Sequence, residues 1–180
     1  MIKLKPVALI LLAYLCLITP SHAASKQEID AKVQESLETF YTSSSAGKKL
    51  AEKAYGILVF PSVTKAGFIV GGEYGEGALI SAGNTEAYYN IVSVSVGYQI
   101  GVQLHSQVIL FMTQEALERF RYSNGWDAGF AGSIAVVNAG ASKEFTIDNV
   151  QEPVIAFIFS EKGLMGNLTL EGSKVSKIEK

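Results

Sequence analysis

The sequence predicts an α+β domain in which N-terminal helices pack on a strongly curved, mostly antiparallel β-sheet. Three observations indicate this class. Helical periodicity is confined to residues 25–55 and to a short stretch after Thr113, short β-patterned segments occupy most of the remaining chain, and strands and helices do not alternate regularly. Enough strands follow one another for the sheet to curl into a barrel, which would remove its edges.

The first 23 residues are typical of a cleavable export signal. Lys3 and Lys5 precede an apolar stretch, Val7–Ile18, and Ser21-His22-Ala23 forms a small-residue cleavage site. About a dozen apolar residues are short for a membrane span, which needs about 20. We therefore expect cleavage after Ala23 and a single domain over residues 24–180, with its core at about 50–180. The expected location is periplasmic or secreted, either soluble or peripheral to an envelope membrane.

Cys16 is the only cysteine in the chain, and it lies inside the apolar part of the signal. A lipid anchor on Cys16 is the alternative to cleavage after Ala23, but Leu15 precedes it where lipoproteins carry a small residue. Removal of residues 1–23 would leave no cysteine, and hence no disulfide or thiol chemistry. It would also leave 13 basic against 17 acidic residues, a net charge of −4, which argues against a nucleic-acid partner.

Two helices are expected before the first strand. In Ser25–Ser45, apolar residues recur at spacings of four, four and three, which places them along one face: Ile29, Val33, Leu37 and Phe40. The second helix, Ala46–Tyr55, carries Lys48, Lys49 and Lys53, and Lys65 follows in the next loop. These lysines are either a solvated helix surface or a site for an anionic lipid head group, where each lysine contributes about 1 kcal/mol.

The most specific stretch is Gly56–Ile80, in which two apolar strand-like runs flank a Pro61-Ser62 turn and lead into a glycine cluster. The glycines that we single out as structural are Gly67, Gly71, Gly72, Gly75 and Gly77. Glycine in a strand indicates positive φ, a bulge or close approach of another backbone.

A nucleotide-binding interpretation of these glycines fails on spacing. No lysine follows the cluster, as a phosphate-binding P-loop requires, and the dinucleotide fingerprint is also absent. Glu73 and Glu76 would place carboxylates where phosphate would lie. We therefore predict no nucleotide partner.

Beyond Ala78 the pattern is β. Residues 88–97 alternate between two sets, as expected when one sheet face is buried and the other is partly polar, and Ala82-Gly83-Asn84 indicates a hairpin turn. Thr113 is expected to cap a helix that contains Ala116, Leu117 and Phe120. The other expected strands are Ile100–Leu104, Val108–Met112, Ser133–Val137, Val154–Ser160, Leu168–Leu170 and Val175–Ile178.

Residues that could support catalysis are scarce. His105 would be the only histidine after processing, in a strand-turn region without an acidic sequence neighbour, and we interpret it as structural or surface-exposed. Zinc sites need about four cysteine, histidine or acidic ligands, which this chain does not supply in a suitable pattern. Glu73 and Glu76 are interpreted as solvated loop residues and not as a hydrolytic pair. We expect no enzyme activity, metal or cofactor.

The Gly56–Ile80 stretch resembles the core of the SYLF domain family. The matching motifs are Gly-Ile-x-x-Phe-Pro at 56–61, Lys-Ala-Gly-Phe at 65–68, Gly-Gly at 71–72 and Gly-Glu-Gly at 75–77. Ser95–Phe120 and Glu161–Ile178 are similar to the second and third blocks of the family, in the same order. The resemblance runs from about Leu50 to the C-terminus.

The resemblance implies lipid binding. Relatives in eukaryotes recognise phosphoinositides through a basic N-terminal segment and are linked to actin patches, and the corresponding lysines here would be Lys48, Lys49, Lys53 and Lys65. Because the first helix is not basic and an export signal precedes it, we carry over lipid binding and leave out the actin role. The expected partner is an anionic phospholipid or membrane surface of a bacterial envelope, such as phosphatidylglycerol or cardiolipin. The alternative is a structural or protein-interaction module without a lipid ligand.

Overall fold

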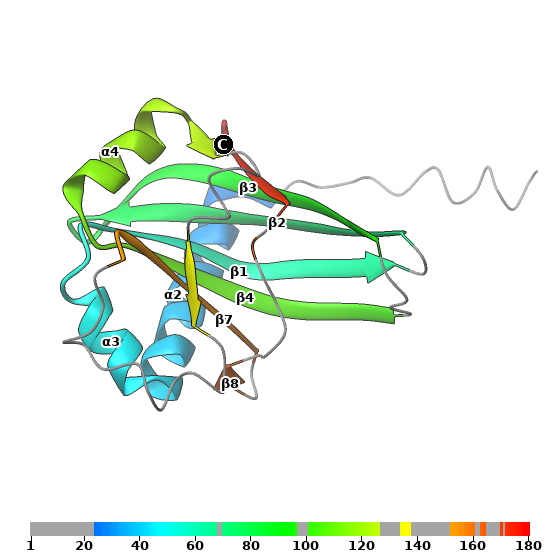
Figure 1. The fold of residues 1–180 in the computed structure, drawn as a ribbon, viewed down its shortest axis with the longest axis horizontal. Helices are drawn as coiled ribbons and strands as arrows, with labels where there is room; N and C mark the ends of the chain where they lie inside the picture. The colour runs from blue at the N-terminus through cyan, green and yellow to red at the C-terminus, as the bar shows by residue number, and fades with distance from the viewer. Residues whose placement is uncertain are drawn as a thin grey trace, which may run out of the picture.

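The computed structural model describes residues 24–67, 70–96, 101–126, 134–137, 152–160, 163–164, 170 and 172–180. The predicted signal segment, Phe68 and Ile69, and most of the predicted strand Leu168–Leu170 lie outside these residues. Figure 1 shows one curled sheet, with α2 and α4 on opposite faces and α3 beside the lower end of α2. The predicted α+β class is confirmed.

The described elements comprise three helices and nine strands. The helices are α2 (Lys26–Ser43), α3 (Ser45–Ala51) and α4 (Gln114–Tyr122). The strands are β1 (Gly56–Gly67), β2 (Val70–Ser81), β3 (Asn84–Val96), β4 (Gly101–Phe111), β5 (Gly125–Trp126), β6 (Ala135–Val137), β7 (Val154–Ser160), β8 (Gly163–Leu164) and β9 (Ser173–Ile178).

The strands form one sheet in the order β5-β9-β3-β2-β1-β4-β7-β6, with β8 paired to β7. Every described pairing is antiparallel except that of β6 with β7. The strong curvature was predicted. Within the described residues no pairing joins β5 to β6, so these strands make an open half-barrel.

Helix α2 forms as the sequence predicts. The Ser25 side chain caps it by accepting a hydrogen bond from the Glu28 backbone N–H at 3.2 Å. Its apolar stripe is buried against β1, β4 and β7, and the rings of Phe40 and Phe157 lie 4.9 Å apart edge to face. Burial of this stripe, and not helix propensity, is the main source of its stability.

Helix α3 is shorter than the predicted Ala46–Tyr55. It begins after Ser44, whose hydroxyl accepts from the Gly47 N–H at 3.0 Å, and ends at Ala51. The Lys53 and Ala54 amides make tight i−3 bonds, and the Tyr55 N–H then donates to the Phe111 carbonyl of β4 at 2.9 Å. The start of sheet pairing therefore ends the helix.

The Pro61-Ser62 pair is not the turn that we predicted, because β1 continues through it. Phe60 and Pro61 together face one residue of β2, Gly77, and the pairing with β4 shifts at the same place. Proline has no N–H to donate to a sheet, so it is tolerated in a central strand at a bulge. The Ser106 hydroxyl donates to the Pro61 carbonyl at 2.8 Å and holds the bulge against β4.

The β2–β3 hairpin is confirmed at the predicted residues. Ala82 and Gly83 have φ values of 49° and 79°, as a two-residue type I′ turn requires. In contrast, the predicted strands Ile100–Leu104 and Val108–Met112 are one strand, β4. The polar residues His105 and Gln107 favour a turn between two strands, but both are buried within the strand pairing.

Helix α4 covers the other face of the sheet and is capped by Thr113 as predicted, whose hydroxyl accepts from the Ala116 N–H at 3.2 Å. Its buried side chains, Ala116, Leu117 and Phe120, join a second core with Tyr89, Phe111 and Trp126. The sheet is thus covered on both faces near its β1 start.

The bulge divides the four long strands into two parts. The proximal half, before the bulge, is sandwiched between α2 and α4. The distal half comprises Ser62–Gly67, Val70–Glu76, Asn90–Val96 and Gly101–Ser106. Figure 1 shows these strand ends extending beyond all three helices.

Candidate functional site

Three of the four predicted head-group lysines gather around the end of α3. Lys48 and Lys49 lie in its last turn and Lys53 follows the capping residue Glu52. All three are exposed, and within the described residues no ion pair joins them to a carboxylate. Cations at a helix C-terminus are favoured by the helix dipole, so these residues form a local positive patch, which we call the α3 lysine cluster.

Lys65 does not belong to this cluster. It lies in β1 and not in a loop, nine residues beyond Gly56, which is about 30 Å at ~3.3 Å per residue. Its Nζ contacts the carboxylate of Glu73, directly opposite on β2, at 2.8 Å, and the two side chains are 16% and 8% exposed. A half-buried lysine that is paired with a buried carboxylate is not available to a membrane head group.

Glu73 and Glu76 are not solvated loop residues, because both lie in β2 and each is paired. They point to opposite faces of the sheet, so they do not form a carboxylate pair. Glu76 accepts from Lys180 Nζ at 2.9 Å and from the Tyr74 hydroxyl at 2.9 Å. Partial burial, together with this bond, raises the pKa of Tyr74 above its usual range.

His105 is buried within β4, so it lies neither at the surface nor in the predicted turn. It is 3% exposed, and its Nε2 lies 2.9 Å from the Gln107 side-chain nitrogen. Burial lowers its pKa, with Glu73 opposing and Lys65 adding to the effect, so the ring is neutral near pH 7. The described residues contain no cluster of three or more His, Cys, Asp or Glu able to hold a metal ion.

The glycines of β2 differ in what surrounds them. None of Gly72, Gly75 and Gly77 has the positive φ that was one predicted reason for glycine. A Cβ on Gly77 would lie 2.0 Å from the Val59 carbonyl oxygen, because the bulge presses into β2 there. A Cβ on Gly72 would meet its nearest neighbour, the Ser93 carbonyl oxygen, at 3.7 Å, an ordinary contact. The close-backbone explanation therefore holds at Gly77 and not at Gly72.

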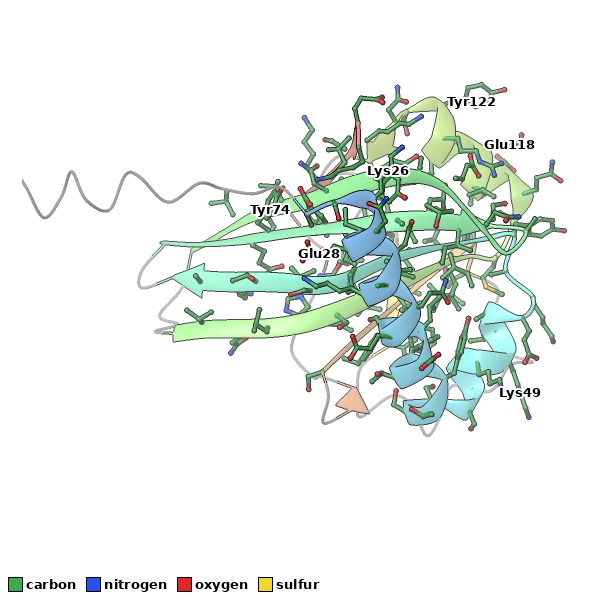
Figure 2. The ribbon with its side chains drawn as sticks, turned by 180° about the vertical axis from the view of Figure 1, so that it is seen from behind. Lys26, Glu28, Lys49, Tyr74, Glu118 and Tyr122 are labelled. Carbon is green, nitrogen blue, oxygen red and sulfur yellow. The ribbon has the colours of Figure 1, made fainter. Side chains whose placement is uncertain are left out.

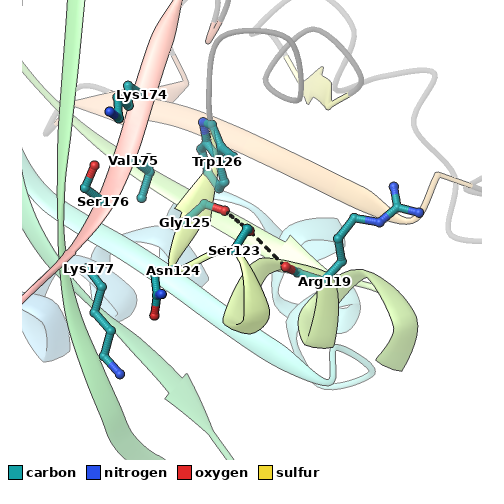
Figure 3. Close-up of a pocket in the computed structure, with 9 residues that line it drawn as sticks. All are labelled: Arg119, Ser123, Asn124, Gly125, Trp126, Lys174, Val175, Ser176 and Lys177. Atoms are coloured by element: carbon teal, nitrogen blue, oxygen red, sulfur yellow. Dashed lines mark hydrogen bonds between the residues drawn. The ribbon is translucent and has the colours of Figure 1, made fainter.

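A pocket of about 490 Å³ lies between the end of α4 and β9, and no sequence pattern indicated it. Figure 3 shows Arg119, Lys174 and Lys177 at its edges, with the Trp126 ring beside Val175. None of the described residues that line it is acidic. The three cations point away from one another instead of converging, so they give a positive border and not a closed anion site.

None of the helices in the part of the chain that the structure describes is long and apolar enough to cross a membrane. The polar features of the described residues are salt bridges, a buried neutral histidine and exposed cations. The fold and these sites define an α+β domain with surfaces suited to binding.

Comparison with known proteins identifies the family. Residues 92–180 match the model of the Ysc84 family, described as Las17-binding protein actin regulator. The chain is 24% identical over 163 residues to the SH3 domain-containing YSC84-like protein 1 of Xenopus laevis, and 26% identical over 164 residues to that of Rattus norvegicus. Both matches cover 86% of this chain and 48% of the relative, so the chain spans about half the length of these curated relatives. The chain belongs to the Ysc84, or SYLF, family.

Proposed function

We propose that this chain is an exported, non-enzymatic domain that binds the surface of anionic phospholipid membranes. The observation that carries the proposal is the α3 lysine cluster, in which three exposed cations surround a single acid, Glu52. Phosphatidylglycerol and cardiolipin, the anionic lipids of a bacterial envelope, are the expected ligands. Export rests on the Lys3–Ala23 signal pattern, and intact-mass measurement of exported protein should give an N-terminus at Ala24.

The head-group contact is tested by converting Lys49 and Lys53 to glutamine. Each lysine near an anionic surface contributes about 1 kcal/mol, so loss of two should weaken vesicle partitioning roughly 30-fold at low salt. The side chains are exposed, so the melting temperature should stay nearly unchanged. Binding is measured by flotation with vesicles of phosphatidylcholine containing phosphatidylglycerol or cardiolipin.

A matched control removes the same charge elsewhere. Arg119→Gln/Lys177→Gln takes two exposed cations from the pocket beside β9 and should leave binding within about threefold of the parent. A larger loss in this control than in Lys49→Gln/Lys53→Gln would move the contact to that pocket. A parent protein that does not float with any anionic vesicle contradicts the lipid proposal itself.

A protein-interaction module is the second candidate function, favoured by the family description as a Las17-binding protein. The two candidates differ in what accompanies the natively exported protein. Stoichiometric phospholipid in mass spectra of the purified protein supports the lipid function. A stoichiometric protein partner without lipid supports the interaction module.

A further inference from the structure

The distal half of the sheet carries apolar side chains on the outside. Tyr74, Val92 and Leu104 align with Thr64 in one row across four strands, and Val94 and Val102 align with Gly72 and Ala66 in the next. Directly paired residues share a sheet face, so these eight residues form one surface, the distal apolar face. Its five large apolar side chains are 42–70% exposed: Tyr74 50%, Val92 42%, Val94 70%, Val102 69% and Leu104 62%.

The distal apolar face continues the face that α2 covers in the proximal half. Strand alternation places Tyr74 on the same side as Ala78 and Ile80, which pack under α2. Figure 2 shows Tyr74 on the strands beside the N-terminal end of α2, where the bare strands begin. The side chains are therefore exposed because the helix does not reach them.

The opposite face of the same strands is less exposed and holds polar groups, although Gln103 at its edge is exposed. Lys65 and Glu73 face each other there, next to Ser93, which is 9% exposed. His105 lies on the same face, in the next row of residues toward the proximal half. Apolar side chains outside and an ion pair inside reverse the usual arrangement of a sheet in water, which marks the outer surface as a contact site.

The dimensions and charge of the distal apolar face indicate its occupant. Four strands spaced about 4.8 Å apart and two rows about 7 Å apart cover of the order of 300 Å² with side chains, well below the roughly 800 Å² per partner of a stable dimer. Lys174 of β9 stands directly opposite Val92 and is exposed at the border. Among the described residues, two acids, Glu76 and Glu28, lie beside Thr64 and Tyr74, and they are paired with Lys180 and Lys32.

We propose that the distal apolar face inserts into the interfacial region of an anionic phospholipid bilayer, with Lys174 at head-group level. This rests on the proposed lipid function and adds a second contact, since the α3 lysine cluster lies at the other end of β1. Aliphatic side chains flanked by lysine suit the boundary between acyl chains and anionic head groups. Insertion of apolar side chains is not screened by salt, whereas the contact of the lysine cluster is.

The test is a triple variant, Val94→Thr/Val102→Thr/Leu104→Thr, which keeps strand propensity while removing apolar surface. We expect its binding to phosphatidylglycerol vesicles in 0.5 M NaCl to fall about tenfold or more, with the melting temperature unchanged. Tyr122→Thr is the matched control, since Tyr122 is 86% exposed on α4, and it should bind as the parent does. Lys49→Gln/Lys53→Gln should retain this high-salt binding.

A second readout follows the environment of single residues. In a Cys16→Ser background, an NBD fluorophore on Val94→Cys should brighten and shift to the blue on anionic vesicles, while one on Tyr122→Cys should not. Equal binding of the triple variant and the parent, or no fluorescence change at residue 94, overturns this proposal. If the parent still floats at low salt, the lipid function stands. A parent dimer that the triple variant converts to a monomer, with unchanged vesicle binding, would instead make this face an interface between copies.

Discussion

The proximal and distal halves of the sheet use the same four strands in opposite ways. In the proximal half, Leu58 and Ile109 are buried against α4 while Val59 and Val108 are buried against α2. In the distal half, one face is less exposed and carries the Lys65–Glu73 ion pair, while Val94 and Val102 are exposed on the other. Alternation alone does not decide which side of a strand is buried. The covering elements decide it.

The two halves therefore contribute differently: the proximal half mainly stabilises the fold, and the outer face of the distal half is available for binding. The helices bury apolar area on both faces of the proximal half, and that burial is the main favourable contribution to folding. The distal half leaves apolar area exposed at a position where no helix covers it. Substitutions should therefore cost stability in the proximal half and on the buried distal face, and change binding on the outer distal face.

The largest contrast is expected for the same substitution at two glycines of β2. Gly77→Ala should destabilise the domain by about 3 kcal/mol, because its Cβ would overlap the Val59 carbonyl and force a backbone shift. Gly72→Ala should stay within about 1 kcal/mol of the parent, because its backbone is extended and the space is open. Urea unfolding of both variants measures this. Equal destabilisation would mean that the bulge does not press on β2.

The next effect concerns the buried ion pair of the distal half. Lys65→Met should cost about 3 kcal/mol, because Glu73 would be left 8% exposed without its cation. Lys65→Met/Glu73→Leu should recover most of this loss, since neither charge remains. Thermal or urea unfolding of the parent, the single variant and the double variant measures both changes in stability. If Lys65→Met left the free energy of unfolding unchanged, the ion pair would be solvated. Lys65 would then again be a candidate head-group residue.

The smallest effect is the pH dependence from His105. Its folded pKa lies below the ordinary 6.5, first because of burial. The unfolded chain therefore takes up a proton that the folded protein resists, so stability is complete above about pH 6.5 and falls as the pH decreases below it. One such group changes stability by at most about 1.4 kcal/mol per pH unit. Urea unfolding between pH 7.5 and 5.5 should show this slope in the parent, and His105→Gln should flatten it.

The elements set by local pattern could be predicted from the sequence. The stripe from Ile29 to Phe40, the Thr113 cap and the Ala82-Gly83 turn depend on side-chain spacing or on residues a few positions away, so their signals are local. The continuity of β1 and β4 was missed. In the sequence, Pro61 and the His105–Gln107 segment look like the ends of strands. A bulge accommodates Pro61 within β1, and buried polar contacts accommodate His105 and Gln107 within β4.

The candidate sites were predictable only where they lie on one segment. Lys48, Lys49 and Lys53 are close in sequence and remain together in space. Lys65 is also near them in sequence, but it lies on an extended strand, about 30 Å beyond the Gly56 end of β1. The distal apolar face brings together residues from positions 64 to 104, and register between four strands determines it.

Local patterns in the amino-acid sequence were enough to predict the apolar stripe of α2, the Thr113 cap, the hairpin turn and the family resemblance, because propensity and motif spacing are local properties. Which face of each strand meets solvent depends instead on how the helices pack against the sheet. Val94 and Val108 are both valines in β-patterned segments, yet one is 70% exposed and the other fully buried. The physical reason is that α2 covers the proximal strands and ends before the distal ones, so the same residue type stabilises the core in one place and remains available for binding in the other.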